Sequence, residues 1–339
     1  MVTNQTSITF RDSGLDGDPE LEASVRDVVT RVESILHETV RSADPVLAET
    51  ARHLADAGGK RFRPLLTALV AQFGDPTAPE VALAGTVVEL THLATLYHDD
   101  VMDEAPVRRG AASANARWGN SIAILTGDFL FSRAADLAAQ LGPEAVRIQA
   151  DTFSRLVHGQ IAETVGPRGS DPVAHYLKVI ADKTGSLIGT SARFGGMFAG
   201  VAPALVDAVS AYGETVGIAF QLSDDLLDIA SESDESGKTP GTDLREGVPT
   251  LPVLYALAED ATDASSVRLR ELLALGPLTD DALVTEALDL LRESAGLKRA
   301  RETVRGYAER ARAHLATLPT GTPRTALESL ADFVADRTA

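Results

Sequence analysis

The segment His98-Asp99-Asp100-Val101-Met102-Asp103-Glu104 follows a helix-like apolar run, residues 87–94, after three intervening residues. Asp99 and Asp103 are four positions apart, so a helix turns both carboxylates to one side, with Asp100 beside them. Two carboxylates about 4 Å apart repel by roughly 1 kcal/mol in water and roughly 4 kcal/mol at an intermediate effective dielectric. A hard divalent cation such as Mg²⁺, which prefers oxygen ligands, would turn this repulsion into binding. Taken alone, the motif fits a solvated acidic helix end at least as well.

A second acidic segment, Gln221-Leu222-Ser223-Asp224-Asp225-Leu226-Leu227-Asp228, repeats the same spacing 125 residues later (224 minus 99). It also ends a helix-like apolar run, residues 216–220. If the two helices face each other, the aspartates of both motifs surround one cavity, and such a cavity needs several divalent ions and an anionic ligand. The pair therefore predicts a metal–diphosphate site.

Composition narrows the class of protein. The chain has 339 residues, of which 44% are hydrophobic and 24% charged, as in ordinary globular proteins. Its net charge of -18, without a basic tract, argues against nucleic acid as a partner. The lack of cysteine excludes disulfides, thiol catalysis and Cys-ligated zinc. With no apolar run near the ~20 residues of a membrane span and no signal-like N-terminus, the sequence predicts a cytoplasmic protein without a transmembrane segment.

Apolar residues recur at helical spacing from residue 20 onward, and no alternating strand pattern appears. We therefore predict an all-α fold, with residues 1–19 as a flexible lead-in and 20–339 as one domain of roughly ten to thirteen helices. Residues 231–249 form the one long irregular segment inside this helical region. Loops of this length are usually functional or disordered, and we interpret this one as a candidate lid.

Basic residues beside flexible backbone are candidates for binding a diphosphate. Gly58-Gly59-Lys60-Arg61-Phe62-Arg63-Pro64 places three cations after two glycines, without the spacing of a P-loop. Arg108-Arg109-Gly110 begins five residues after Asp103, and arginine binds phosphate oxygens bidentately. Lys183-Thr184 and Gly237-Lys238 are further candidates, although each lysine alone is as compatible with a surface position.

These motifs together resemble the trans-isoprenyl diphosphate synthases of the polyprenyl synthetase family, from about Asp44 to the C-terminus. The matching segments are residues 58–64, 89–103, 108–110, Leu125-Thr126-Gly127-Asp128, Lys183-Thr184, 221–225, 237–247 and Thr250-Leu251-Pro252. The resemblance implies helices around a central cavity and a medium- to long-chain all-trans-polyprenyl diphosphate synthase that works as a homodimer.

The resemblance also implies roles for individual residues. Two Mg²⁺ ions would be held by Asp99, Asp100 and Asp103, and a third by Asp224, Asp225 and Asp228; Mn²⁺ is expected to substitute. The allylic diphosphate would contact Arg108, Lys183, Thr184, Gln221 and Lys238. Isopentenyl diphosphate would be bound by Lys60, Arg63, His92 and Arg109. Without the resemblance, His92 would be interpreted as a core histidine. Further candidates near the cavity are His98, Gln160 and Glu163.

In this family the allylic C–O bond ionises, and metal ions and cationic side chains stabilise the departing pyrophosphate. The double bond of isopentenyl diphosphate then attacks the allylic cation, and loss of a proton, taken by pyrophosphate, leaves a trans product five carbons longer. The allylic partner is expected to be geranyl, farnesyl or geranylgeranyl diphosphate. The site must exclude water, which would quench the cation.

Product length is expected to depend on what blocks the apolar tunnel beneath the first acidic motif. Family members with short products carry a bulky aromatic residue about five positions before the first aspartate. Ala94 stands there, with Thr95 next to it, so we predict an open tunnel and a product longer than C20, in the C30–C50 range. Ala94→Tyr or Ala94→Phe is expected to shorten the product.

Three alternatives stay open at the level of sequence. A farnesyl or geranylgeranyl diphosphate synthase would share every motif and differ in tunnel length. A class I terpene cyclase shares the all-α fold and first acidic motif but usually has a different second metal motif and lacks the basic pair at 58–64 and 108–110. A non-catalytic partner subunit should have lost site residues, and none is missing here.

Overall fold

The structure is a computed structural model that describes residues 18–59, 61–230, 240–259 and 262–337. The described residues form sixteen α-helices, one π-helical turn, one 3₁₀ turn and a single two-stranded hairpin, so the predicted all-α class is confirmed. The helix number exceeds the ten to thirteen expected, because several helices are short, such as the five-residue α5 and α11. Several predicted features lie outside the described residues: Lys60, the lead-in up to residue 17, and residues 231–239 of the candidate lid, which include Lys238.

The first half of the chain contains α1 (Pro19–Thr39), α2 (Pro45–Asp56), α3 (Phe62–Ala71), α4 (Pro79–Met102), β1 (Val107–Arg108), β2 (Ala111–Ala112), α5 (Ala114–Trp118), α6 (Asn120–Gln140) and α7 (Pro143–Val165). The second half contains α8 (Pro172–Ile180), the π turn η2 (Ala181–Gly185), α9 (Ser186–Phe198), α10 (Pro203–Ala230), α11 (Thr242–Glu246), α12 (Leu251–Ala258), α13 (Ala264–Leu273), α14 (Asp281–Glu293), α15 (Ala295–His314), η3 (Leu315–Thr317) and α16 (Thr322–Asp336).

Helices α1, α2 and α8 each start at an Asp-Pro pair. The Asp44 side chain accepts a hydrogen bond from the amide of Leu47 at 2.9 Å, and Asp171 does the same for Ala174 at 2.8 Å. In both cases proline occupies the first helical position, where a missing amide hydrogen costs nothing. These helix starts are therefore stabilised by contacts within the local sequence.

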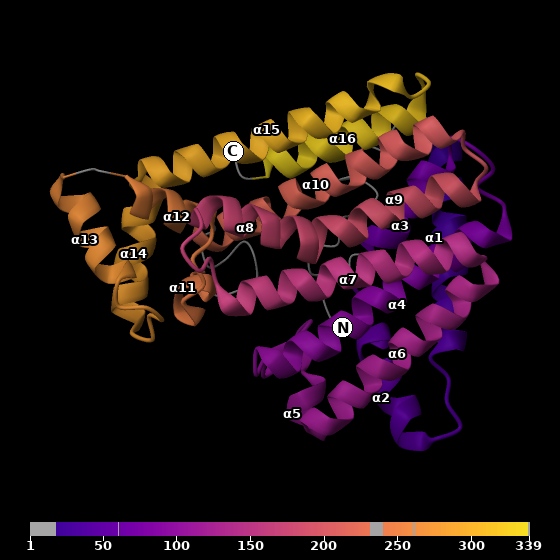
Figure 1. Ribbon diagram of the computed structural model, residues 1–339, viewed down its shortest axis with the longest axis horizontal. Coiled ribbons are helices and arrows are strands. Elements are labelled where there is room, and N and C mark those ends of the chain that lie inside the picture. The colour runs from indigo at the N-terminus through magenta and orange to yellow at the C-terminus, as the bar shows by residue number, and fades with distance from the viewer. Residues whose placement is uncertain (1–17, 60, 231–239, 260–261, 338–339) are drawn as a thin grey trace.

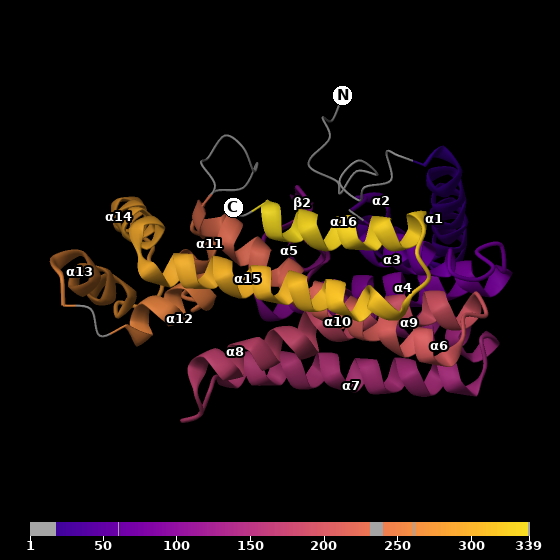
Figure 2. The ribbon, with the colours of Figure 1, turned by 90° about the horizontal axis from the view of Figure 1, so that it is seen from above.

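Two long helices, α4 with 24 residues and α10 with 28, occupy the interior. Helices α1, α3, α6 and α9 surround α4, whereas α9, α15 and α16 pack on α10 (Figures 1 and 2). Helices α9 and α10 approach closely because glycine faces the contact: a Cβ on Gly213 would lie 2.8 Å from the carbonyl oxygen of Ile188. Both acidic motifs lie at the carboxyl ends of these two interior helices.

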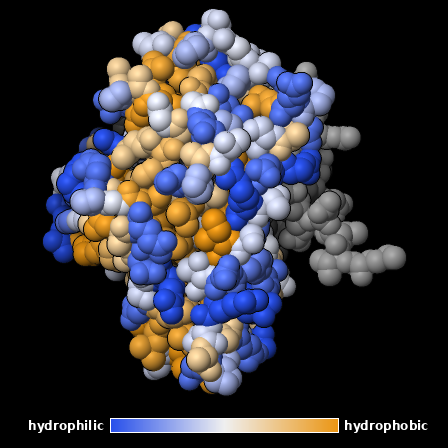
Figure 3. All heavy atoms as spheres, turned by 90° about the vertical axis from the view of Figure 1, so that its right-hand side faces the viewer, coloured by the Kyte–Doolittle hydropathy of each residue, from blue (hydrophilic) through white to orange (hydrophobic). Residues whose placement is uncertain are grey.

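Helices α11–α14 form a lobe at one end of the molecule, beyond the carboxyl end of α10 (Figure 1). The opposite end of the molecule has an apolar area at its centre, bordered by hydrophilic residues (Figure 3). Among the described helices, none combines the length and the apolar composition that crossing a bilayer requires.

Candidate active site

The first acidic motif ends α4, and its carboxylates are unequally buried. Asp100 is fully buried, with Oδ1 2.5 Å from Nε of Arg108, while its Oδ2 has no hydrogen-bond partner among the described residues. Burial raises the pKa of Asp100, against the pull of the Arg108 charge. Burial also raises the pKa of Asp99 to about 6, opposed by the charge of Lys183 and reinforced by that of Asp103. The positive charges of Arg108 and Lys183 thus do not fully compensate the buried negative charge of this motif.

A tight hairpin follows α4, and in it the side chains of Arg108 and Arg109 point to different partners. Arg108 ends strand β1, and the turn residues Arg109 and Gly110 have φ values of 55° and 77°, as a two-residue hairpin turn requires. Arg108 turns to Asp100, whereas Arg109 donates to the carbonyl oxygens of Leu54, at 2.9 Å, and Gly58. The change of backbone direction at the turn therefore separates the two guanidinium groups.

Arg109 belongs to a half-buried basic cluster made with His92, Arg61 and Arg63 around the carboxylate of Glu89. Arg61 Nη1 donates to Glu89 Oε1 at 2.8 Å. Burial lowers the pKa of Arg63 to about 10, with Glu89 opposing and Arg109 reinforcing the shift. Burial and then the neighbouring arginine charges hold the pKa of His92 well below its usual range. Arg61 also pairs with Glu33, so two carboxylates face three guanidinium groups. The remaining positive charge suits the cluster to binding an anion.

The lowered pKa of His92 predicts how stability depends on pH. In the unfolded chain the imidazole binds a proton near pH 6.5, whereas in the folded protein it stays neutral there. The unfolded state therefore binds more protons below about pH 6.5, and this contribution to stability falls as the pH decreases, by up to about 1.4 kcal/mol per pH unit. In His92→Gln, the free energy of unfolding should fall less between about pH 7.5 and 5.5 than in the unmodified protein.

Chemical denaturation at a series of pH values measures this difference. His314→Gln, at the end of α15, is a matched control that should leave the slope unchanged. If the unfolding free energies of the unmodified protein and His92→Gln ran parallel over this range, His92 would not be held neutral by its surroundings.

The second acidic motif, on α10, is linked to two other helices. Asp225 accepts hydrogen bonds from the hydroxyl of Tyr176, on α8, and from Nε2 of Gln221 at 3.0 Å. Burial raises the pKa of Asp225 to about 7, against these two hydrogen bonds and together with the charge of Asp224. Gln221 in turn accepts from the hydroxyl of Thr184 at 3.3 Å, which ties the π turn to this motif.

The outer aspartates of this motif have partners from later in the chain. Asp224 lies 2.8 Å from Nη2 of Arg337, which follows α16. The carboxylate of Asp228 accepts from the amides of Thr242, at 3.2 Å, and Asp243, at 3.1 Å, at the start of α11. Asp228 therefore orders the short helix that follows residues 231–239.

The two motifs converge on a residue of α11. Burial raises the pKa of Glu246, and the charges of Asp103 and of Asp228 raise it further, so both motif ends lie within electrostatic reach of it. Across the part of the chain that the structure describes, no three His, Asp or Glu side chains already form a metal-binding group. The unpartnered Oδ2 of Asp100 and the raised pKa values of both motifs nevertheless fit carboxylates that bind cations.

A cavity of about 380 Å³ opens beside the first motif. Its polar lining comes from Thr95, His98, Asp99, Gln160 and Lys183. Its apolar lining comes from Val101, Met102, Ile124, Phe131, Phe153, Leu156, Val157 and Ile161. The amine of Lys183 lies 2.5 Å from Oε2 of Glu163. Ala94, by contrast, is fully buried in the apolar core around α4, and the cavity wall contains Thr95 instead.

Sequence reasoning missed Tyr176 and Arg337, which contact the second motif from α8 and from the end of α16. Neither belongs to a motif, and no local sequence pattern indicates them.

The structure brings the remaining described candidates into two groups. Arg63, His92 and Arg109 lie in the basic cluster, and Asp99, Asp100, Asp103, Arg108, Lys183, Thr184, Gln221, Asp224, Asp225 and Asp228 belong to the acidic motifs or contact residues of them.

Comparisons with known proteins agree with this arrangement. The family model for polyprenyl synthetase matches residues 44–291. The chain is 56% identical over 328 residues to nonaprenyl diphosphate synthase of Mycobacterium tuberculosis, covering 96% of this chain and 97% of that protein. It is 45% identical to dimethylallyltranstransferase of the same organism, covering 93% and 96%. Among solved structures, the chain is similar to geranylgeranyl pyrophosphate synthase from Corynebacterium glutamicum, crystallised with calcium and isoprenyl diphosphate. The TM-score is 0.86 and the sequence identity 49%, and the match covers 95% of this chain and 98% of that one.

Proposed function

The chain belongs to the polyprenyl synthetase family, and we propose that it condenses isopentenyl diphosphate head-to-tail (1′-4) with an allylic diphosphate. The protein is a trans-prenyltransferase that makes an all-trans-polyprenyl diphosphate longer than C20. The single observation that carries the proposal is one cavity with two kinds of wall. Asp99 and Lys183 offer groups for a metal-bound diphosphate, and aromatic and aliphatic side chains offer an apolar surface for the growing chain.

Each diphosphate has its own candidate binding groups. Arg108, Lys183, Thr184 and Gln221 are proposed to bind the allylic diphosphate, and Arg63, His92 and Arg109 that of isopentenyl diphosphate. Arginine suits this role because its guanidinium is permanently charged and forked. Lys60 and Lys238, outside the described residues, stay predictions for the same two sites. Residues 20–339 are proposed to act as one catalytic domain, since α15 and α16, beyond the matched residues, pack on α10.

The protein belongs to a family of divalent-metal-dependent enzymes. We propose Mg²⁺, with Asp99, Asp100 and Asp103 holding two ions and Asp224, Asp225 and Asp228 a third. When bound, the ions would neutralise the allylic diphosphate and stabilise the pyrophosphate that leaves.

The side chains of the protein orient the substrates and exclude water. Arg108 and Lys183 hold the allylic diphosphate while the bond between the allylic carbon and its oxygen breaks. The basic cluster holds isopentenyl diphosphate alongside, so that its double bond attacks the allylic cation in an effectively unimolecular step. The proton lost from the new chain goes to the released pyrophosphate. The apolar cavity wall keeps water away from the cation.

We also propose that the protein works as a homodimer through α6 and α7. These two helices expose large apolar side chains, which monomeric proteins seldom gather on neighbouring helices. The exposed residues outside the cavity lining are Leu125, Val146 and Val165, and the exposed Ile124, Phe153, Val157 and Ile161 also line the cavity. Light scattering on the full chain measures the mass in solution, and a monomeric mass would contradict this part of the proposal.

The activity is tested by incubating the full chain with Mg²⁺, labelled isopentenyl diphosphate and separate C5, C10, C15 and C20 primers. We expect the label to enter diphosphates longer than C20, with geranyl, farnesyl or geranylgeranyl diphosphate as primer, and a chelator to abolish the reaction. Thin-layer chromatography after phosphatase treatment sizes the product. Release of cyclic hydrocarbon without incorporation of label would indicate a cyclase instead.

A further inference from the structure

The helix that contains Lys183 is interrupted at that residue. Helices α8 and α9 form one continuous helix, but residues Ala181–Gly185 take a π-helical turn. Such turns are rare and often occur at functional sites, because the extra residue changes where side chains point. Here two consecutive residues reach different cavities: Lys183 lines the cavity beside Asp99, and Asp182 lines a separate surface hollow between α7 and α8.

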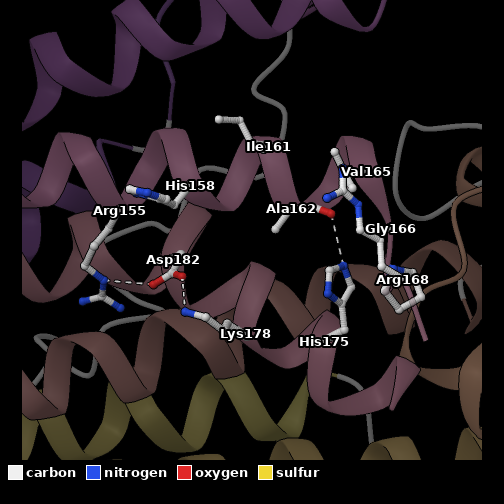
Figure 4. Close-up of a pocket in the computed structure, with 11 residues that line it drawn as sticks. Arg155, His158, Ile161, Ala162, Val165, Gly166, Arg168, His175, Lys178 and Asp182 are labelled. Atoms are coloured by element: carbon white, nitrogen blue, oxygen red, sulfur yellow. Dashed lines mark hydrogen bonds and ion pairs between the residues drawn. The ribbon is translucent and has the colours of Figure 1, made fainter. Parts of the chain in front are cut away.

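Arg155, on α7, holds this turn from outside the catalytic cavity (Figure 4). Its Nε lies 3.0 Å from Oδ1 of Asp182, and its Nη2 donates to the carbonyl oxygen of Ala181 at 3.3 Å. Both terminal nitrogens also donate to the carboxylate of Glu214 on α10, at 2.6 and 3.2 Å. One guanidinium therefore joins α7, the π turn and α10.

Close backbone packing leaves the turn little freedom on the α7 side. A Cβ on Gly159 would lie 2.8 Å from the backbone nitrogen of Lys183 and 3.2 Å from the Cβ of Asp182. On the α10 side, a Cβ on Gly185 would lie 3.1 Å from the carbonyl oxygen of Glu214. The turn is thus enclosed by two helices, and Arg155 spans them across its first residues.

A hollow of about 670 Å³ lies beside these residues, and in its lining Arg155, Lys178 and Asp182 bind one another. The amine of Lys178 lies 2.7 Å from Oδ2 of Asp182, and Nε2 of His175 lies 3.1 Å from the carbonyl oxygen of Ala162 (Figure 4). The charged groups of Arg155, Lys178 and Asp182 are therefore an ion-pair network and do not resemble a ligand site.

We propose that Arg155, Asp182 and Glu214 are positioning residues that hold the π turn so that Lys183 and Thr184 face the allylic diphosphate. The inference rests on the proposed role of Lys183. A guanidinium suits the task because its planar fork satisfies two carboxylates at once, which a lysine amine cannot do with the same geometry. None of the three touches the substrate; they act through the backbone of the turn.

The test compares steady-state kinetics of the full chain and its variants with an allylic primer varied. Arg155→Gln should raise the primer KM about tenfold, by analogy with the outer partners of metal ligands, whose mutation typically costs 10- to 100-fold. The KM for isopentenyl diphosphate should stay near its normal value. Glu214→Gln should act in the same direction, and Arg155→Lys should recover only part of the loss.

Arg147 is the matched control for Arg155. It lies on the same helix and also pairs with two carboxylates, Glu144 at 2.6 Å and Asp151 at 2.8 Å, but all three are exposed and neither ion pair involves the turn or α10. Arg147→Gln should leave both KM values unchanged. Hydrogen exchange should quicken at residues 181–185 in Arg155→Gln and not in Arg147→Gln.

A double-mutant cycle with Lys183→Ala separates positioning from general destabilisation. If Arg155 acts through the turn, Arg155→Gln should change the primer KM by less than about twofold once Lys183 is gone. Additive losses would overturn the inference, as would a normal primer KM in Arg155→Gln while Lys183→Ala is impaired. An unchanged KM in Lys183→Ala would instead reject the proposed role of Lys183, and the inference with it.

Discussion

Replacing Asp100 by asparagine is expected to lower kcat/KM by about 10³-fold. A metal ion bound at this motif would stabilise the transition state by several kcal/mol, and this stabilisation would be lost. Asparagine keeps the size of the side chain but removes the charge that would bind Mg²⁺. Asp100 is the member of the first motif that is fully buried, and its Oδ2 lacks a hydrogen-bond partner among the described residues. That oxygen is free to bind a cation without breaking the ion pair of Oδ1 with Arg108.

Folding should survive this change. Burial raises the pKa of Asp100, so the folded protein already disfavours its ionised form, and a neutral side chain is not expected to destabilise it. The unfolding midpoint should stay within about 4 °C of normal. Half-maximal activity should need more Mg²⁺ in Asp100→Asn, which magnesium titration measures. Asp136→Asn, exposed on α6, is the matched control with normal activity.

A normal magnesium requirement together with a large loss of activity would point to the Arg108 pair, and not to metal binding, as the role of Asp100. Activity close to normal would remove Asp100 from the site altogether. Both results can be told from misfolding by the unfolding midpoint.

The parts of this site that could be predicted are those encoded by local spacing. The i, i+4 pattern puts Asp99 and Asp103 on one side of a helix end whatever surrounds it. The all-α class follows from the same periodicity. The family resemblance then assigned roles that spacing alone does not contain, such as that of His92.

The remaining features depend on packing between distant segments. Tyr176 and Arg337 reach the second motif from residues 49 and 113 positions away (225 minus 176, and 337 minus 224), and neither stands in a recognisable pattern. The π turn was not predicted from the sequence, and it lies where α7 and α10 both approach the chain closely. The hairpin with Arg108 has strands of two residues, too short to show alternation.

The choice between Ala94 and Thr95 shows the same limit at the scale of one residue. Helix α4 is buried on almost every side, so its sequence has no polar face from which the direction of the cavity could be read. One step along a helix turns the side chain by about 100°. That step separates Ala94, packed in the core, from Thr95, which lines the cavity.

Thr95→Phe is therefore expected to shorten the product from more than C20 to C20 or less. The ring would project into the cavity between α4 and the aromatic pair Phe131 and Phe153, whose centroids are 4.4 Å apart. Each isoprene unit that enters gains about 0.8 kcal/mol per buried CH₂, and a blocked wall removes that gain for every later unit. Phe153→Ala opens the opposite wall and should lengthen the product. Chromatography of the dephosphorylated products measures both shifts.

Two controls separate tunnel length from other effects. Thr285→Phe makes the same exchange at an exposed position on α14, outside the cavity lining, and should leave product length unchanged. Ala94→Phe places its ring in closed core, where overpacking typically costs about 1–3 kcal/mol, so it should lower the unfolding midpoint more than Thr95→Phe. If Thr95→Phe kept the full product length while Ala94→Phe shortened it, the growing chain would run along the other side of α4. The cavity beside Asp99 would then have to be reassigned.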